Sequence, residues 1–385
     1  MTHGFRETTM DAIVPPENLP EYLPYIIDDG TLAFHLRTRP KVMWWMLLNK
    51  DKLYTVHRIP KRTGGVRIIH APEIRFKRFL QKVENLMLKP IQAQLGNHVT
   101  AYRPKKSTKD AVLQHLPPCP VCDAAPVGQT PKSHDCPRQG IYIHMDIKDF
   151  FPSTKRSWIR NYFKGQGYSH YVGGILADLM TVGNIPHQKN PNKLRVGVPQ
   201  GAPTSGTICN IIANERFDQK VIAYFATLNT KLPDDRQWKY SRYSDDLSIT
   251  CGAKTTRKKV NDVIAKVTEI VQESGYRINR KKTRVIHKYF RKSMLGIVFN
   301  QHPNIAKDRY MKLRALCHNC LVQGFEPQLE VTHKASVEEL RYWLGGTINY
   351  VGQIHQVRGD KLRAVYEEAL LKHGLVEAPD VVATN

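Results

Sequence analysis

The N-terminal third of the chain contains two short runs in which β-branched and aromatic side chains are frequent. The first run is LYTVHRI at 53–59, and the second is VRIIHA at 66–71. A basic, glycine-containing segment at 61–65 separates them, and two such runs joined by a short glycine-rich turn predict a β-hairpin. We expect this hairpin to carry positive charge at its tip.

Two further β-prone segments place acidic side chains at the ends of strands. In GIYIHMD, at 140–146, the run ends at Asp146, which predicts a strand with a carboxylate at its end. In WKYSRYSDDLSIT, at 238–250, two runs flank Ser244 and Asp245, which predicts a tight hairpin with acids at its tip. If the two segments are neighbouring strands, their carboxylates come together.

Helical spacing of apolar side chains occurs in three segments. Residues 73–88 have arginine and lysine between the apolar positions, which predicts an amphipathic helix with a basic outer face. A long helix is also predicted over 205–228, and a last helical block over about 336–372, where Ser336-x-x-Glu339 is a capping-box sequence. Together with the strands, these helices predict an α+β protein.

Charge narrows the classes of partner. The 385 residues carry a formal net charge of +24, and the basic residues are spread along the whole chain. This pattern favours binding of an extended polyanion.

The longest apolar run, at 42–48, is too short to span a bilayer, so we expect no membrane partner. The start, MTHGFRETTMDAI, lacks the apolar stretch of a signal peptide. An odd count of seven cysteines argues against a disulfide framework, and we expect a cytoplasmic protein.

The adjacent acids Asp245 and Asp246 need an explanation, because like charges this close raise each other's pKa. A solvated turn, a salt-bridged pair and a divalent cation are the three alternatives. Asp234 and Asp235 follow a proline in a polar linker without flanking strands, so we assign that pair to a solvated turn. Together with Asp146, the first pair supplies hard oxygen ligands of the kind that suit Mg²⁺. Two such ions can support nucleotidyl transfer.

A separate group of metal-ligating residue types lies in the segment 116–139. Its six prolines and three cysteines predict an inserted loop without regular structure. The four side chains with zinc-ligand chemistry and spacing are Cys119, Cys122, His134 and Cys136. Structural Zn²⁺ and free thiols in a loop are both open at this point. Cys317 and Cys320, three residues apart on a predicted helix, are most simply core residues.

Three motifs resemble those of reverse transcriptases, and they occur in that family's order. DIKDFFPS resembles the first palm motif, GVPQGAPTSGTICN the Gln-Gly motif, and YSDD the Tyr-x-Asp-Asp box. The resemblance covers most of the chain: RIPKRTGGVRIIHAP resembles the fingers hairpin, INRKKTRV the lysine-bearing palm segment, and MLGIVFN with MKLRALCHN the start of the thumb. The combined pattern is much more specific than any single motif.

Within that family the sequence looks most like bacterial retron reverse transcriptases, which are related to group II intron enzymes. DAVLQH at 110–115 is similar to their Asn-Ala-x-x-His element, with Asp110 in place of asparagine. PQGAPTS is their form of the Gln-Gly motif. Gly206 stands where proline is usual, and SMLG at 293–296 replaces a Val-Thr-Gly signature associated with template RNA recognition.

The resemblance implies a right-hand polymerase fold, with an antiparallel palm sheet packed on helices and a helical thumb. The implied domains are an N-terminal region and fingers over 1–110, a palm over 111–290 with the cysteine-rich insertion at 116–139, and a thumb over 291–385.

The resemblance also implies a two-metal Mg²⁺ site and a dNTP site. The catalytic acids would be Asp146, Asp245 and Asp246, all three of them metal ligands together with Ile147, and Asp246 would be the secondary ligand. The nucleotide-binding residues would be Lys61, Arg67, Phe151 as a steric gate against ribose, Gln200, Tyr243 and Lys282 as proton donor to pyrophosphate. Core packing of Phe151 or Tyr243, a solvated basic hairpin, and Lys281 in place of Lys282 are the alternatives.

For RNA binding, the resemblance points to Ala111, His115, Arg314 and His318. The implied partners are a structured non-coding RNA that serves as template and primer, its cDNA in a retron-like RNA–DNA hybrid, dNTPs, and a separate effector protein in antiphage defence. One alternative is a bacterial defence reverse transcriptase that makes untemplated or repetitive DNA. Another is a nucleic-acid-binding scaffold that restrains an effector.

Overall fold

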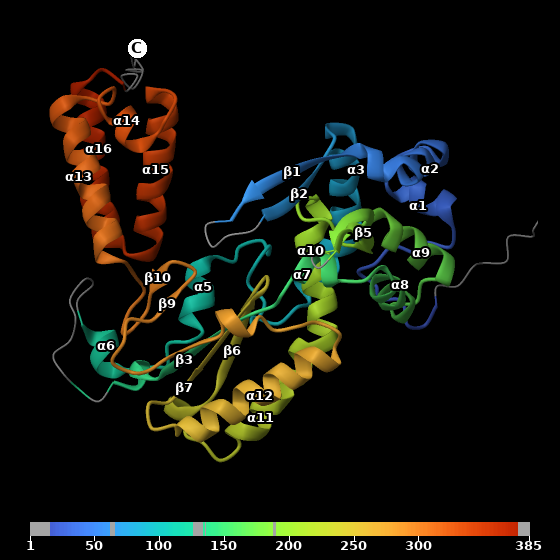
Figure 1. Ribbon diagram of the computed structural model, residues 1–385, viewed down its shortest axis with the longest axis horizontal. Coiled ribbons are helices and arrows are strands. Elements are labelled where there is room, and N and C mark those ends of the chain that lie inside the picture. Colours follow the sequence, from blue (N-terminus) through green and yellow to red (C-terminus); the bar gives the residue numbers. More distant parts are fainter. Residues whose placement is uncertain (1–15, 62–65, 126–133, 135, 188–189, 376–385) are drawn as a thin grey trace, which may run out of the picture.

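The computed structural model describes residues 16–61, 66–125, 134, 136–187 and 190–375 (Figure 1). A four-stranded antiparallel sheet, which we call the central sheet, has the strand order β6-β7-β3-β8. Its strands are β3 (Ile141–Asp146), β6 (Lys239–Tyr243), β7 (Asp246–Cys251) and β8 (Arg284–Ile286). The predicted strand at 140–146 and the predicted hairpin at 238–250 are both confirmed. The turn of that hairpin consists of Ser244 and Asp245.

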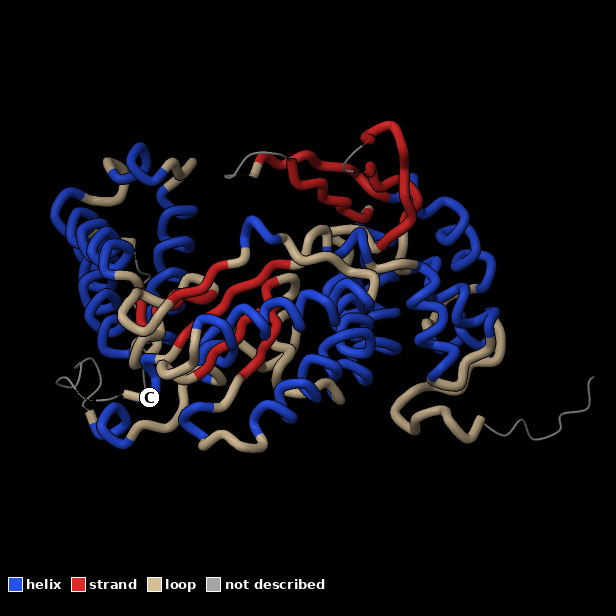
Figure 2. Tube along the Cα trace, turned by 60° about the horizontal axis from the view of Figure 1, so that its bottom comes forward, coloured by secondary structure: helices blue, strands red, loops and turns tan. Residues whose placement is uncertain are grey.

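The long helices around the central sheet follow the sequence pattern closely. The predicted helix 205–228 is α10 (Pro203–Ala213), a π-helical turn (Asn214–Asp218) and α11 (Gln219–Asn229) in succession. With α12 (Arg257–Glu273), α11 covers one face of the sheet (Figures 1 and 2). The predicted amphipathic helix 73–88 is α3 (Ile74–Val83) followed by a π-helical turn (Glu84–Leu88). Its apolar side is buried at Phe76, Phe79, Leu80, Val83 and Met87.

The predicted N-terminal hairpin is confirmed as β1 (Tyr54–Pro60) paired antiparallel with β2 (Val66–Pro72). Its turn at 62–65 lies outside the described residues. The strands are mostly exposed, and the hairpin projects from the fold toward the C-terminal helices (Figure 1). Its base is anchored where Tyr54 packs edge-to-face on Phe76 and His70.

The C-terminal helical block is confirmed, while two other expectations, the closed capping box and the segment 116–139, needed correction. The predicted helical block 336–372 is two helices, α15 (Val337–Ile354) and α16 (Gln356–Lys372), because His355 between them adopts extended backbone. Ser336 caps α15 as predicted, by accepting from the Glu339 N–H, but the Glu339 carboxylate accepts from Ala335 instead of closing the box on Ser336. The segment 116–139 was expected to lack regular structure, yet it contains the short helix α6 (Pro120–Ala124).

The remaining elements complete the architecture. Before the central sheet lie α1 (Asp29–His35), α2 (Pro40–Asn49), α4 (Lys89–Ala93) and α5 (Thr108–Leu113). Between β3 and α10 lie α7 (Phe150–Ser153), α8 (Arg156–Gly165), α9 (His170–Leu179) and the hairpin β4 (Val182–His187) with β5 (Asn190–Gly197). After β8 lie β9 (Ser293–Met294), β10 (Ile297–Val298), β11 (Asn304–Ile305), α13 (Lys307–Gln323) and α14 (Gln328–Thr332).

Two hydrophobic cores organise the described residues. The first extends from Leu23 to Ile278 and includes the central sheet and the helices that pack on it. The second lies mainly within the C-terminal bundle, which we define as α13 to α16, and it also contains Ala111, Val112 and Tyr142. The domain boundaries near 110 and 290 stay predictions from the sequence. In the described part of the chain, no helix combines the length and apolar character needed to cross a bilayer.

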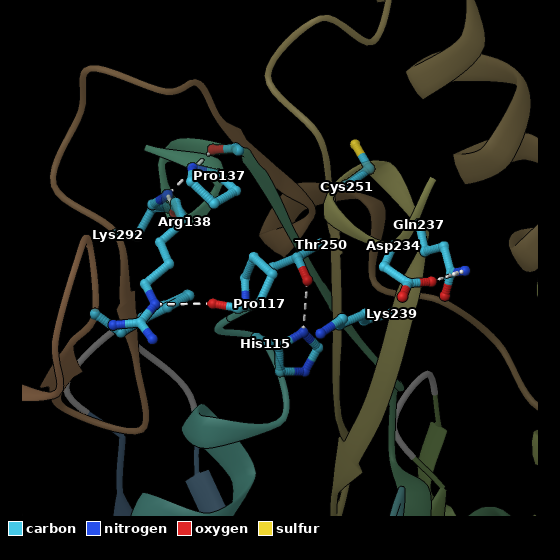
Figure 3. A pocket seen from close by; sticks show the side chains of 12 residues that line it. His115, Pro117, Pro137, Arg138, Asp234, Gln237, Lys239, Thr250, Cys251 and Lys292 are labelled. Carbon is cyan, nitrogen blue, oxygen red and sulfur yellow. Dashed lines mark hydrogen bonds between the residues drawn. The ribbon is translucent and has the colours of Figure 1, made fainter. Parts of the chain in front are cut away.

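His115 links the end of α5 to the central sheet. Its Nε2 lies 2.8 Å from the Ser241 hydroxyl on β6, and its Nδ1 lies 2.9 Å from the Thr250 hydroxyl on β7 (Figure 3). The side chain is 3% exposed, and burial lowers its pKa to about 3. The neutral imidazole is therefore part of the folded structure.

This buried histidine predicts a specific pH dependence of stability. The unfolded chain binds a proton at His115 as the pH falls through about 6.5, whereas the folded chain does not until about 3. The contribution of neutral His115 to the free energy of unfolding is thus fully present above about pH 6.5. It falls by about 1.4 kcal/mol for each pH unit below that value. Urea unfolding of the wild type and of His115→Gln measures this: their free-energy difference should shrink on acidification. A His57→Gln control on exposed β1 should follow the wild type, and parallel curves for His115→Gln would contradict the assignment.

Candidate active site

Three carboxylates meet at one edge of the central sheet. Asp146 ends β3 and stands directly opposite Asp246, the first residue of β7, while Asp245 lies in the turn just before it. The Ile147 N–H donates to the Asp245 carbonyl oxygen at 2.8 Å, which joins the two chain segments beyond the sheet. Asp146 is only 4% exposed. The pairing of β3 with β7 therefore brings together the acids that the sequence placed at strand ends.

The charges at this edge are incompletely balanced. Burial, followed by the charge of Asp246, raises the pKa of Asp245 to about 6. Asp246 is held by His144, whose Nε2 lies 2.9 Å from Asp246 Oδ1. Burial alone would lower the pKa of His144, but the hydrogen bond and charge of Asp246 raise it overall. A raised carboxyl pKa means that a further cation would stabilise the ionised site.

Lys282 supplies one positive charge. The Asn279 N–H donates to the Asp146 carbonyl oxygen at 2.7 Å, and this contact positions the short helical turn Arg280–Lys282 beside β3. The Lys282 ammonium then lies 2.9 Å from Asp146 Oδ2, and this hydrogen bond raises its pKa. The side chain is 53% exposed, so it reaches the acids from the solvent side. Lys282 is thus in contact with Asp146, and its role as proton donor to pyrophosphate stays a prediction from the sequence.

A buried arginine, which the sequence analysis missed, supports the acidic turn from below. Arg242 on β6 is fully buried and donates to both carboxylate oxygens of Asp218, at 2.7 to 3.0 Å. It also donates to Asn210 Oδ1 at 2.8 Å and to the Ser244 carbonyl oxygen at 3.1 Å. Tyr240 donates to the same aspartate at 2.6 Å. Because Ser244 precedes Asp245, this network determines where the catalytic turn lies.

Phe151 lies next to a second aromatic side chain that was also missed. The rings of Phe151 and Tyr102 meet edge-to-face with centroids 6.2 Å apart, and the Tyr102 hydroxyl lies 3.4 Å from the Ser244 hydroxyl. A Cβ at Gly206 would lie 2.5 Å from the Tyr102 ring. Glycine in place of the usual proline thus leaves room for this ring. Phe151 itself is half-buried, so both packing and a gate role are compatible with its position.

Gln200 and Gly201 dock the N-terminal hairpin. The His70 N–H on β2 donates to the Gln200 carbonyl oxygen at 2.8 Å. Gly201 has a φ of +129°, and a Cβ there would lie 2.7 Å from the His70 carbonyl oxygen. Among the described residues, the close neighbour of Gly201 is therefore the backbone of the hairpin.

Three other predicted nucleotide-site residues lie near this surface. Lys61 follows β1, and Arg67 is exposed on β2 opposite Ile59, so both are at the far end of the hairpin. Tyr243 is the last residue of β6 and pairs with Asp246. Tyr243 therefore lies beside the acids, while the two basic residues are carried by a separate element above them (Figure 1).

The predicted RNA-binding residues fall into two groups. Ala111 and His115 are buried, at 1% and 3% exposure, and pack α5 against the core, so their role in RNA binding stays a prediction from the sequence. Arg314 and His318 are exposed on α13. Arg314 also lines a cleft of about 660 Å³ between α13 and α16, together with Tyr310, Arg358 and Lys361.

The four predicted zinc ligands are also brought together. The donor atoms of Cys119, Cys122, His134 and Cys136 all lie within 4.8 Å of one another. They lie near α6 and the start of β3, at the opposite end of β3 from Asp146.

The acidic edge fits Mg²⁺ by its donor set. It offers hard carboxylate oxygens from Asp146, Asp245 and Asp246, and the pKa of Asp245 is raised first by burial and then by the negative charge of Asp246. The Lys282 ammonium neutralises only part of that charge. Ile147 lies beside these acids, with its N–H occupied by Asp245.

The sequence gives little indication of the roles of Arg242 and Tyr102, the two residues that the sequence analysis missed. Arg242 is a charged residue inside a β-prone run, which is a weak indication of a buried ion pair. Its partners Asp218 and Asn210 lie 24 and 32 residues away on helices. Tyr102 lies in a polar stretch, and nothing local connects it to Gly206 or Ser244.

Comparison with known proteins agrees with this geometry. The profile of the family "Reverse transcriptase (RNA-dependent DNA polymerase)" matches residues 59–319, more than half of the chain. The retron Mx65 reverse transcriptase of Myxococcus xanthus is 27% identical over 320 residues, which cover 80% of this chain and 63% of that protein. The retron Ec86 reverse transcriptase of Escherichia coli is 23% identical over 215 residues, covering 56% of this chain and 57% of that protein.

This chain therefore spans between half and two thirds of the length of these curated relatives. A solved telomerase from Candida albicans in complex with a fragment of telomeric RNA covers 86% of this chain and 67% of its own. Its sequence identity is 13% and its TM-score is 0.43, too distant a likeness to support an inference. The family profile, the order of the motifs and the α+β architecture agree with one another. The chain belongs to the reverse transcriptase (RNA-dependent DNA polymerase) family and is of the bacterial retron type.

Proposed function

We propose that this protein is an RNA-directed DNA polymerase. The observation that carries the proposal is the meeting of Asp146, Asp245 and Asp246 at one edge of the palm sheet, with the pKa of Asp245 raised to about 6. Three clustered carboxylates repel one another in the free protein. A cluster of this kind is typical of a site that binds cations together with a polyphosphate.

Each residue at this edge has a separate role in the proposed reaction. Asp146 and Asp245 would hold two Mg²⁺ ions, and Asp246, held by His144, would be the secondary ligand. Bound Mg²⁺ would activate the attacking hydroxyl and stabilise the leaving pyrophosphate. Lys282 approaches Asp146 from solvent, so its ammonium is placed to donate a proton to the departing pyrophosphate. Arg242 and Asp218 hold the turn that carries Asp245, so that little reorganisation is needed.

The retron relatives support a finer proposal. We infer that the template is a structured non-coding RNA, that synthesis is primed from a 2′-hydroxyl of that RNA, and that the product is an RNA–DNA hybrid used with a separate effector in antiphage defence. Their names and the PQGAPTS and DAVLQH motifs support this. Sequencing the nucleic acid that copurifies with the protein tests it: one enriched structured RNA joined to cDNA is expected, and bulk cellular RNA would contradict it.

The scaffold alternative makes a different prediction about catalysis. Asp245→Asn removes a metal-ligand charge and little volume, so Mg²⁺-dependent dNTP incorporation should fall by about 1,000-fold or more, while RNA binding persists. Primer extension and filter binding measure the two properties. Asp234→Asn, at an exposed aspartate of the second Asp-Asp pair in the sequence, is the matched control and should retain activity. Wild-type extension by Asp245→Asn would end the polymerase assignment.

Phe151 is predicted to select the sugar. Phe151→Val removes the ring beside Tyr102 and opens room for a 2′-hydroxyl, so the ratio of rNTP to dNTP incorporation should rise by about tenfold or more. The measurement is single-nucleotide kcat/KM for matched rNTP and dNTP. Phe151→Tyr keeps the ring and should keep the ratio low. An unchanged ratio in Phe151→Val would show that this ring only fills the core.

The cleft between α13 and α16, which we call the thumb cleft, is predicted to bind RNA phosphates. Arg314 and Lys361 are both exposed and lie on facing helices at this cleft. The double variant Arg314→Ala/Lys361→Ala should weaken binding of many RNAs and reduce the slope of log K against log salt by about 1.5. Lys258→Ala/Lys259→Ala on α12 removes the same charge from a different surface. If the slope of log K against log salt is the same for the two double variants, RNA does not bind at the thumb cleft.

A further inference from the structure

The cysteine-rich segment between α5 and β3 has no part in the polymerase site. It lies beside α6, at the outer side of the palm near β9 and β10 (Figure 1). Among the described residues of this segment, the buried apolar cluster consists of Cys119, Cys122 and Cys136. Three thiols alone bury little apolar surface, and a bound metal ion would supply the further stabilisation that such a small cluster lacks.

The four donor atoms have the spacing of a tetrahedral metal site. Zinc–sulfur bonds of about 2.3 Å and zinc–nitrogen bonds of about 2.05 Å give tetrahedron edges of about 3.8 Å between sulfurs and about 3.6 Å between sulfur and nitrogen. The sulfurs of Cys122 and Cys136 are 3.4 Å apart, and those of Cys136 and Cys119 are 3.9 Å apart. His134 Nε2 lies 3.4 Å from Cys119 Sγ and 3.6 Å from Cys122 Sγ.

We propose that Cys119, Cys122, His134 and Cys136 bind one structural Zn²⁺ ion, and that this zinc module clamps the base of the thumb to the palm. The thiolate-rich ligand set favours zinc over Mg²⁺ or Ca²⁺, which prefer oxygen. Four protein ligands leave no open position, which is the arrangement of a structural site and not a catalytic one. Binding displaces the thiol protons to solvent and involves no change of oxidation state.

A carboxylate outside the ligand set supports this site. Asp123 Oδ2 accepts from the Cys119 N–H at 3.0 Å, which fixes the backbone of the first ligand. Its other oxygen accepts from the Arg138 guanidinium. Outer partners of this kind orient ligands and are part of how metal sites are held. Arg138 follows the last cysteine by two residues, so the ion pair closes the module on itself.

Arg138 also connects the module to the thumb. Its side chain is almost fully buried, and it donates to the Pro117 carbonyl oxygen at 2.9 Å and to the Gln301 carbonyl oxygen at 3.0 Å. Gln301 lies between β10 and β11, at the point where the chain enters the thumb. Lys292, just before β9, is also buried and donates to the carbonyl oxygens of Arg138 and Gly140, at 2.7 and 3.1 Å (Figure 3).

The contacts run in both directions across one boundary. An arginine of the module reaches the thumb entrance, and a lysine of the thumb entrance reaches the module. A cavity of about 20 Å³ lies where these residues meet the palm, lined by Arg138 and Lys292 together with His115, Lys239 and Thr250 among others (Figure 3). It has room for about one water molecule and is far too small for a nucleotide. We therefore assign this region to docking of the two parts and not to ligand binding.

Metal content tests the zinc site. Protein purified without chelator should contain one equivalent of zinc, and Co²⁺ substitution should give tetrahedral d–d bands with thiolate charge transfer. His134→Cys keeps four ligands, so it should keep the metal and increase the charge-transfer intensity. His134→Ala should weaken zinc affinity by about 100-fold or more. Cys320→Ala, a buried thumb thiol outside the cluster, is the control and should retain zinc.

A zinc-free wild type with no tetrahedral Co²⁺ spectrum would overturn the site, as would full zinc retention in Cys119→Ser/Cys122→Ser. Hydrogen–deuterium exchange tests the clamp: removing zinc from the wild type, or His134→Ala, should speed exchange over 292–301 by about tenfold or more, while β7 stays protected. Unchanged protection over 292–301 after zinc loss would refute the clamp. Neither readout depends on polymerase activity, so failure here and failure of Asp245→Asn to lose activity are separate results.

Discussion

The buried ion pair between Arg242 and Asp218 is the interaction on which the active site depends. Moving two charges out of water is costly, and the loss is recovered only when every remaining donor and acceptor finds a partner. Here Asn210, Tyr240 and the Ser244 carbonyl oxygen provide those partners. The guanidinium also lies over the rings of Phe150 and Phe217, with centroid distances of 5.5 and 5.7 Å. The pair thereby joins β6, the helix α10, the π-helical turn after it and the catalytic turn.

A rigid palm with looser attachments follows from this arrangement. The acids are fixed by strand pairing and by the buried network, which is the condition for electrostatic preorganisation. The N-terminal hairpin, in contrast, docks on the palm mainly by its base, through contacts such as that of His70 with Gln200. The thumb has its own core. Elements with few buried contacts to the palm can move relative to the acids at a lower free-energy cost than the palm strands can.

The inserted segment adds contacts at the joint where the chain enters the thumb. The strands β9, β10 and β11 contain only two residues each, too few to position a four-helix bundle by themselves. Arg138 and Lys292 add buried, directional hydrogen bonds at this joint, and the clustered cysteines and histidine give the module that carries Arg138 a way to be ordered. The same joint links the position of the thumb to the palm sheet.

The sequence by itself determined the hairpin, the acids at strand ends, the main helices, the order of the motifs and the spacing of the four metal-ligand residues. These are local patterns, because periodicity and turn residues reflect burial and backbone preference within a few positions. Only the tertiary structure decided that Arg242 meets Asp218, that Tyr102 fills the space at Gly206, that His115 is buried between Ser241 and Thr250, and that Arg138 reaches Gln301. Each of these contacts joins residues far apart in the chain. The free energy of such a contact depends on the partner and on exclusion of water, and neither property is visible in the neighbouring sequence.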